Sequence, residues 1–119
     1  MNDVRYFKGI HKCGGREVVC AVYDAPQEGL TGTYIARITD VCRGNHKDIQ
    51  TEAELAENVQ AMREITKEEH DFFCATGHLI TEIWMNQYTG GFPRESNVLS
   101  FERTLHTALH ATINNLKEG

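Results

Sequence analysis

Four polar side chains recur at helical spacing near the C-terminal end: Arg103, His106, His110 and Asn114. Side chains three or four positions apart on a helix project from one face, so these groups would form a single stripe. A guanidinium binds phosphate through paired hydrogen bonds, and an imidazole adds a donor whose charge changes near neutral pH. The stripe therefore indicates an anion-binding face. An ordinary solvated helix surface is the alternative interpretation of the same pattern.

The pair His106 and His110 also has the spacing of two zinc ligands on a helix. A metalloprotease would carry Glu directly after the first histidine, where this chain has Thr107, so that hydrolytic mechanism is not supported. A third ligand would have to come from elsewhere, for instance His78 or Cys74, which are also four residues apart and have Asp71 and Glu82 nearby on the same face. We expect neither a bound metal nor a cofactor.

Three further segments carry groups that suit a nucleotide. His11–Arg16 and Arg43–Lys47 combine cations with glycines, whose backbone N–H groups can approach an anion closely. Trp84, Asn86 and Tyr88 lie at the end of a long predicted helix. The two aromatic rings could stack on a base, and the amide could hydrogen-bond to it. Solvated turns and core packing are the alternative interpretations. The predicted ligand-binding residues are Arg43, Trp84, Asn86, Tyr88, Arg103, His106 and His110.

No recognisable catalytic motif is present. The chain contains no G-x-S-x-G, P-loop or G-x-G-x-x-G sequence, and its four cysteines, at positions 13, 20, 42 and 74, show no C-x-x-C spacing. We therefore assign no catalytic residue and expect binding rather than chemistry. The N-terminus shows no apolar signal region, so we expect reduced thiols and a cytoplasmic location.

The first half of the chain predicts β structure. Strands are expected over residues 5–12 and 17–23, joined by a tight turn at Cys13–Arg16, and over residues 33–41. Residues 24–32 are expected to form a loop, and residues 42–48 a polar connection.

The second half predicts helices. Thr51 and Thr66 each begin a capping-box sequence, and Leu55, Val59 and Met62 follow the first box at helical spacing. The second box begins a long helix to about Tyr88, and a last helix begins near Ser96 or Asn97.

Together these elements predict one α+β domain over residues 1–119. It would contain a small antiparallel sheet, made of an N-terminal hairpin plus a third strand, followed by two or three helices packed on one face. A three-stranded sheet has two open edges and one uncovered face, which dimerisation would cover.

The charge distribution limits the classes of partner. The net charge of −5 is uneven: residues 1–50 carry +1 and residues 51–119 carry −6. Nucleic acid is an unsuitable partner for such a chain, because phosphates require a basic face. The longest apolar run, Val18–Tyr23, is too short to cross a membrane.

The stretches Tyr6–Cys20 and Gly44–Ile49 resemble the Thoeris anti-defence sponges, small phage proteins that block bacterial immunity. The resemblance implies a small sheet with helices and an oligomeric assembly in the host cytoplasm. It also implies that a cyclic ADP-ribose signal is trapped without cleavage. The implied pocket lies at a subunit interface, where arginine binds phosphates and aromatic rings bind a base.

The leading hypothesis is thus a non-enzymatic oligomer that sequesters a small phosphorylated ligand, such as a cyclic nucleotide or an ADP-ribose derivative. Arg103 would pair with phosphate, supported by His106, His110 and Arg43, while Trp84 or Tyr88 stacks on the base and Asn86 hydrogen-bonds to it. Two alternatives stay open. One is an anti-CRISPR-like inhibitor that binds a basic protein through its acidic helices. The other is an orphan metal- or thiol-dependent enzyme.

Overall fold

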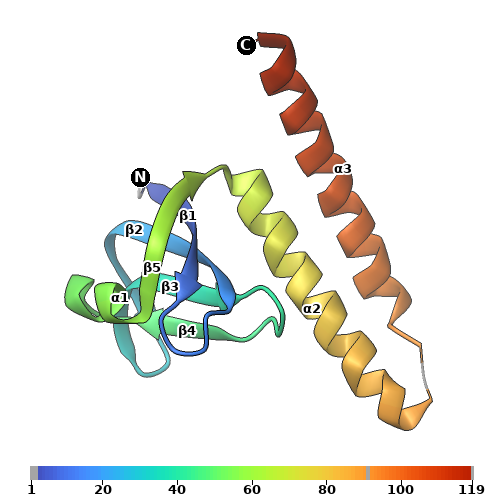
Figure 1. Ribbon diagram of the computed structural model, residues 1–119, viewed down its shortest axis with the longest axis horizontal. Helices are drawn as coiled ribbons and strands as arrows, with labels where there is room; N and C mark the ends of the chain where they lie inside the picture. The colour runs from blue at the N-terminus through green and yellow to red at the C-terminus, as the bar shows by residue number, and fades with distance from the viewer. Residues whose placement is uncertain (1–2, 91, 119) are drawn as a thin grey trace.

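A computed structural model describes the backbone of residues 3–90 and 92–118, and the side chains of that part except those of residues 87–89, 97 and 118. Strands and helices follow each other in the order β1 (Val4–His11), β2 (Glu17–Gly29), β3 (Gly32–Asp40), β4 (His46–Ile49), α1 (Glu52–Asn58), β5 (Val59–Ile65), α2 (Lys67–Thr89) and α3 (Glu95–Glu118). This arrangement confirms the predicted α+β class, with an antiparallel sheet that precedes the two long helices (Figure 1).

The sheet has five antiparallel strands in the order β4-β3-β2-β1-β5, so β2 is central. Neighbouring residues of a strand face opposite sides, and both sides of β2 are apolar. Val18 and Cys20 belong to a core cluster that Leu55 of α1 helps to cover. Val19 belongs to the second cluster, with Phe73 of α2. The central strand is therefore buried between two different helical covers.

Residues 59–65 are a strand, and the prediction of a helix through Val59 and Met62 is wrong. Ala61 has a φ of 56°, which places a bulge in β5, and the register with β1 shifts between Lys8 and Ile10. The bulge leaves Val59 and Met62 on the same face of the sheet at a spacing of three, which imitates a helical period, while Ile65 belongs to the core cluster on the opposite face. Gly9 of β1 permits the close approach, because a Cβ there would lie 2.6 Å from the Val59 side chain.

Two loop predictions are also wrong. Residues 24–29 continue β2 beyond a register shift between Val22 and Gln27, and His46–Ile49 pairs with β3 as the edge strand β4. Both segments are rich in polar residues because they lie at the periphery of the sheet, where side chains stay in contact with water. Ile49 of β4 is nevertheless fully buried and completes the core.

The long helix α2 begins and ends where the sequence predicts. The Thr66 hydroxyl accepts from the Glu69 N–H at 3.1 Å and the Glu69 carboxylate accepts from the Thr66 N–H at 3.5 Å, which is a complete capping box. Gly90 ends the helix with a φ of 73°. At the other predicted box, Thr51 caps α1 but the Glu54 carboxylate accepts from the Gln50 N–H instead.

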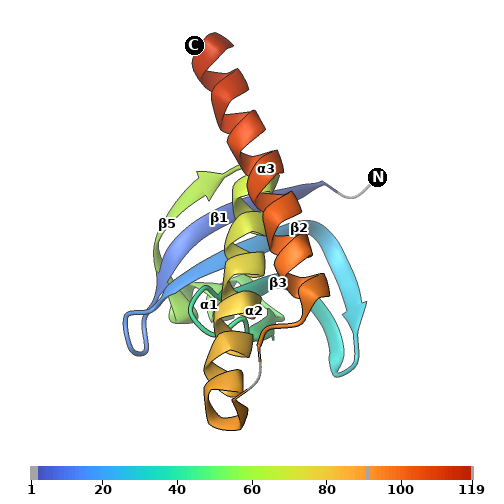
Figure 2. The ribbon, with the colours of Figure 1, turned by 90° about the vertical axis from the view of Figure 1, so that its right-hand side faces the viewer.

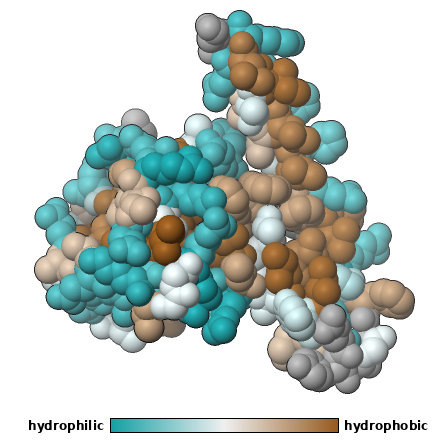
Figure 3. Space-filling view, viewed as in Figure 1, coloured by the Kyte–Doolittle hydropathy of each residue, from teal (hydrophilic) through white to brown (hydrophobic). Residues whose placement is uncertain are grey.

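Helix α2 lies against the sheet, and α3 packs on α2 on the side away from the sheet (Figures 1 and 2). The expectation that the helices all cover one sheet face is thus wrong, because α1 and α2 cover opposite faces and α3 packs on α2. Its C-terminal half extends beyond α2, and Figure 3 shows brown, apolar surface along it. The exposed apolar residues of this half include Leu109, Ile113 and Leu116. Within the described residues, no helix is long and apolar enough to span a membrane.

Candidate functional site

The two basic glycine-containing segments lie side by side at one end of the sheet. Antiparallel pairing brings this about, because β2 begins where β1 ends and Val18 of β2 is opposite Asp40, the last residue of β3. The backbone bond from the Val41 N–H to the Glu17 carbonyl, at 3.1 Å, joins the two segments. The turns between β1 and β2 and between β3 and β4 therefore form one continuous surface.

Asp40 holds these turns in place. Its carboxylate, whose side chain is only 11 % exposed, accepts from Arg16 Nε at 2.6 Å and from the N–H groups of Cys42 and Arg43 at 2.8 and 3.1 Å. A partly buried ion pair with two further charge-assisted hydrogen bonds orients its neighbours strongly. The position of Arg43 relative to Arg16 is consequently set by one shared carboxylate.

The N–H groups of Gly15 and Gly44 have a different role from the one predicted. The Gly15 N–H donates to the His11 carbonyl at 3.1 Å, and the Gly44 N–H donates to the Asp40 carbonyl at 2.8 Å. Both donors are thus used inside the turns. Side chains rather than these backbone groups are the donors available to a ligand.

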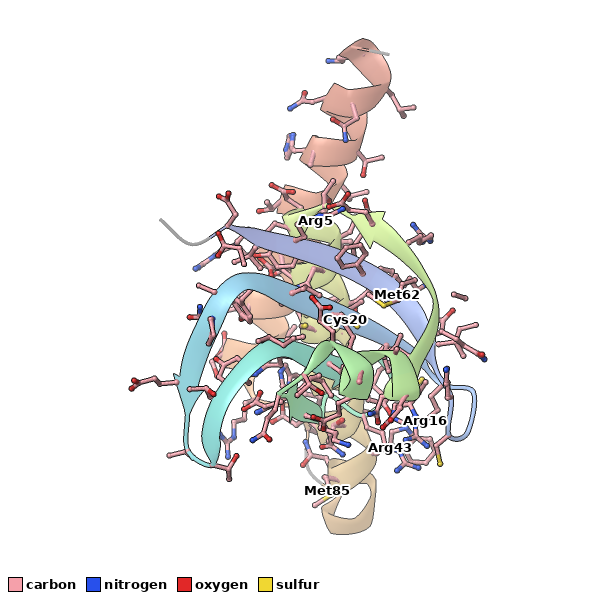
Figure 4. All side chains as sticks on the ribbon, turned by 90° about the vertical axis from the view of Figure 1, so that its left-hand side faces the viewer. Arg5, Arg16, Cys20, Arg43, Met62 and Met85 are labelled. Carbon is pink, nitrogen blue, oxygen red and sulfur yellow. The ribbon has the colours of Figure 1, made fainter. Side chains whose placement is uncertain are left out.

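A hollow of about 140 Å³ lies between the turns, and we call it the basic-turn hollow. Its polar lining residues come from both turns and from the strand ends beside them: His11, Arg16, Asp40, Arg43, Asn45, His46 and Lys47. In Figure 4 Arg16 and Arg43 lie near each other, and Met85 of α2 lies below them.

Helix α2 docks on the second turn through glycine. A Cβ at Gly77 would lie 2.8 Å from the Val41 carbonyl oxygen and 3.0 Å from the backbone of Asp40 and Gly44, so only glycine fits without displacement. One turn further along, the Thr81 hydroxyl donates to the Arg43 carbonyl. These contacts fix the next turn of α2, which carries Trp84, beside Arg43.

The second hollow, which we call the Trp84 hollow, has a volume of about 410 Å³. It lies between the β3–β4 turn and α2, and it is lined by Cys42, Arg43, Asn45, Thr81, Trp84 and Met85. Trp84 is 59 % exposed. Within the described residues, the guanidinium of Arg43 has no hydrogen-bond or ion-pair partner. Arg43 and Asn45 line both hollows, which therefore adjoin.

The structure brings together only part of the predicted site. Arg43 and Trp84 share a hollow, but Arg103 lines a different one with Lys67, Glu68 and Asp71. Asp71 and Trp84 are 13 residues apart on α2, which corresponds to about 20 Å along the helix axis. Arg103 is therefore remote from Trp84 within one chain.

The remaining predicted residues lie on the helices. His106 and His110 are exposed on α3, with ring centroids 6.1 Å apart. Asn86 is half-buried on α2 and already has an interaction within the chain. The side chain of Tyr88 lies outside the described residues.

Three residues that line the Trp84 hollow were not predicted individually from the sequence: Asn45, Thr81 and Met85. Asn45 lay within a segment already singled out for its cations. Thr81 and Met85 follow Gly77 at intervals of four residues along α2, and the signal that could have found them is this glycine inside a predicted helix.

The metal alternative finds no support in the geometry. Within the part of the chain that the structure describes, no three His, Cys, Asp or Glu side chains are grouped so that they could hold a metal ion. His106 and His110 in particular lack a third ligand there.

The thiol alternative has a partial geometric basis. Cys74 Sγ lies 3.8 Å from His70 Nε2, and His70 Nδ1 lies 3.2 Å from Asp71 Oδ1. Burial, however, raises the pKa of the Cys74 thiol. A thiol with a raised pKa stays protonated at neutral pH, and the protonated form is a poor nucleophile.

Comparison with known proteins adds no relative to this description: no family model, curated protein or solved structure matches the chain.

Proposed function

We propose that the protein is a non-enzymatic binding protein that sequesters a small phosphorylated ligand, a cyclic nucleotide or an ADP-ribose-like signal, and so inhibits host immune signalling. One observation carries this proposal. An exposed indole ring and a guanidinium with no described partner line the same hollow from separate elements.

The chemistry of the Trp84 hollow suits such a ligand. The Trp84 ring offers a stacking surface for a base, and Arg43 offers a bidentate donor for a phosphate. Asn45 and Thr81 add polar groups at the rim. A volume of about 410 Å³ falls within the range of small-molecule pockets, about 300–1,000 Å³.

We further propose that the working form is an oligomer. The apolar residues Leu109, Ile113 and Leu116 are exposed on the free half of α3, and a second copy would bury them. The stripe of Arg103, His106 and His110 could reach a Trp84 hollow only from another copy, because about 20 Å separates them within one chain.

The test is a thermal-shift screen against cyclic nucleotides and ADP-ribose derivatives. A ligand in hundredfold excess over its Kd stabilises the native state by about 2.7 kcal/mol, which raises the melting temperature by several degrees. The bound ligand is then recovered from denatured protein and analysed by mass spectrometry. An unchanged mass supports sequestration, and an altered mass contradicts it.

Two pairs of variants locate the site. Trp84→Ala and Arg43→Ala should abolish the shift. Their matched controls, Phe92→Ala and Lys12→Ala, remove an exposed ring and an exposed cation that line neither hollow and should leave the shift intact. Arg103→Ala should weaken binding only if the second copy contributes its stripe. A salt-sensitive complex with a basic protein, without any small-ligand shift, would favour the protein-inhibitor alternative instead.

A further inference from the structure

We propose that the basic-turn hollow is a separate binding site for a tetrahedral oxyanion, either free phosphate or the terminal phosphate of a phosphomonoester. This inference goes beyond the Trp84 hollow, because no Phe, Tyr or Trp side chain lines the basic-turn hollow and its ligand needs no base.

The charge of the lining is opposite to that of the whole chain. Arg16, Arg43 and Lys47 bring three cations, and Asp40 brings one carboxylate, which leaves +2 with both histidines neutral. The whole chain has a net charge of −5. A local cationic hollow on an acidic protein concentrates the field on a small anion and gives it a preferred place to bind.

The Asp40 carboxylate does not neutralise all the cations that line the hollow. Asp40 is occupied by Arg16 Nε and by two backbone N–H groups. Arg43 has no described side-chain partner, and Lys47 lies 3.9 Å from Glu54 and 3.4 Å from Asn58 with its side chain 57 % exposed. Arg43 and Lys47 therefore keep donors free for a ligand.

The size of the hollow selects a small group. Its volume of about 140 Å³ corresponds to about five water molecules at about 30 Å³ each. That volume is below the usual range for whole small molecules, about 300 Å³ and more. A single phosphate group fits this size and can accept hydrogen bonds from several directions at once.

The donors are also held in position before any ligand binds. The Arg16–Asp40 pair and the backbone bond between Val41 and Glu17 join the two turns. Preorganised donors lose little conformational freedom when the anion binds, so more of the interaction appears as affinity.

The experiment is a titration of the full chain with inorganic phosphate. NMR chemical shifts of the backbone amides of residues 43–47 and of the His46 imidazole are measured at each phosphate concentration. We expect saturable shifts at these groups. Lys47→Ala should weaken the affinity about tenfold, since a hydrogen bond to a charged group is lost. Lys12→Ala removes the same charge from the neighbouring turn without lining the hollow, and it should change the affinity less than twofold.

A second arm uses ribose 5-phosphate in place of inorganic phosphate. Saturable shifts with either probe support the site, and the tighter probe identifies the source of the phosphate group. The proposal is overturned if neither probe gives saturable shifts, or if Lys47→Ala and Lys12→Ala weaken binding equally. Trp84→Ala should leave phosphate binding unchanged, so a failure of the proposed function and a failure of this site are told apart.

Discussion

Gly77→Ala is expected to weaken both the fold and the Trp84 hollow. The added Cβ would lie 2.8 Å from the Val41 carbonyl oxygen and 3.0 Å from the backbone of Asp40 and Gly44. All three neighbours are backbone atoms of a turn that Asp40 already holds, so none can rotate away as a flexible side chain would. Relief therefore requires that α2 move away from the turn.

Two opposing effects determine the magnitude. Alanine is favoured over glycine inside a helix by about 1 kcal/mol. Overpacking at a tightly packed position costs about 1–3 kcal/mol, and three backbone contacts at or below 3.0 Å place this case at the upper end. The net expectation is a loss of about 2 kcal/mol, which lowers the melting temperature of a chain of this size by roughly 6–10 °C.

Urea unfolding followed by circular dichroism measures this loss, and the thermal-shift screen measures the effect on ligand binding. Thr112→Ala is the control, because it raises helix propensity at an exposed position of α3 without changing any contact with the turn. If Gly77→Ala stabilised the protein by about 1 kcal/mol, as for a solvent-facing helical glycine, the docking geometry that places Trp84 beside Arg43 would be incorrect.

Four further predictions concern individual side chains. Asp40→Ala should lower the free energy of unfolding by about 2–3 kcal/mol in urea titrations, because it leaves Arg16 and two backbone N–H groups without their acceptor; a loss under 0.5 kcal/mol would contradict this. Thr66→Ala should cost about 1 kcal/mol through the lost cap, measured in the same way, whereas Thr107→Ala on α3 serves as a control that removes no cap. Alkylation of the native protein should modify the exposed Cys13 and Cys42 before Cys74 and Cys20. Burial raises the pKa of the Cys74 thiol, and it raises the pKa of Cys20 to about 12. Because the folded-state pKa of Cys20 lies above its ordinary value of 9.0, the stability that this thiol contributes should be complete below pH 9 and decrease as the pH rises toward 12; rapid labelling of Cys20 at pH 8 would show that the central strand is accessible.

Local signals were sufficient where one short segment determines its own structure. The Thr66 capping box and Gly90 located both ends of α2, because a helix terminus is set by hydrogen bonds among a few neighbouring residues. The turn at Cys13–Arg16 was located correctly for the same reason, since it depends on glycines with positive φ. Residue types alone also singled out both cationic turns and Trp84, which the structure places around two adjoining hollows.

Tertiary structure alone decided how these groups combine. The bulge at Ala61 exists because β5 pairs with β1 opposite Gly9, a partner about fifty residues away that no local pattern of Val59 and Met62 reveals. Likewise, Arg43 and Trp84 line one hollow because Gly77 allows α2 to approach the turn closely. The position of α3 along α2 places Arg103 at a different hollow. Residue types and their spacing along one element determine which chemistry is available, but only long-range packing determines which of those groups share a hollow.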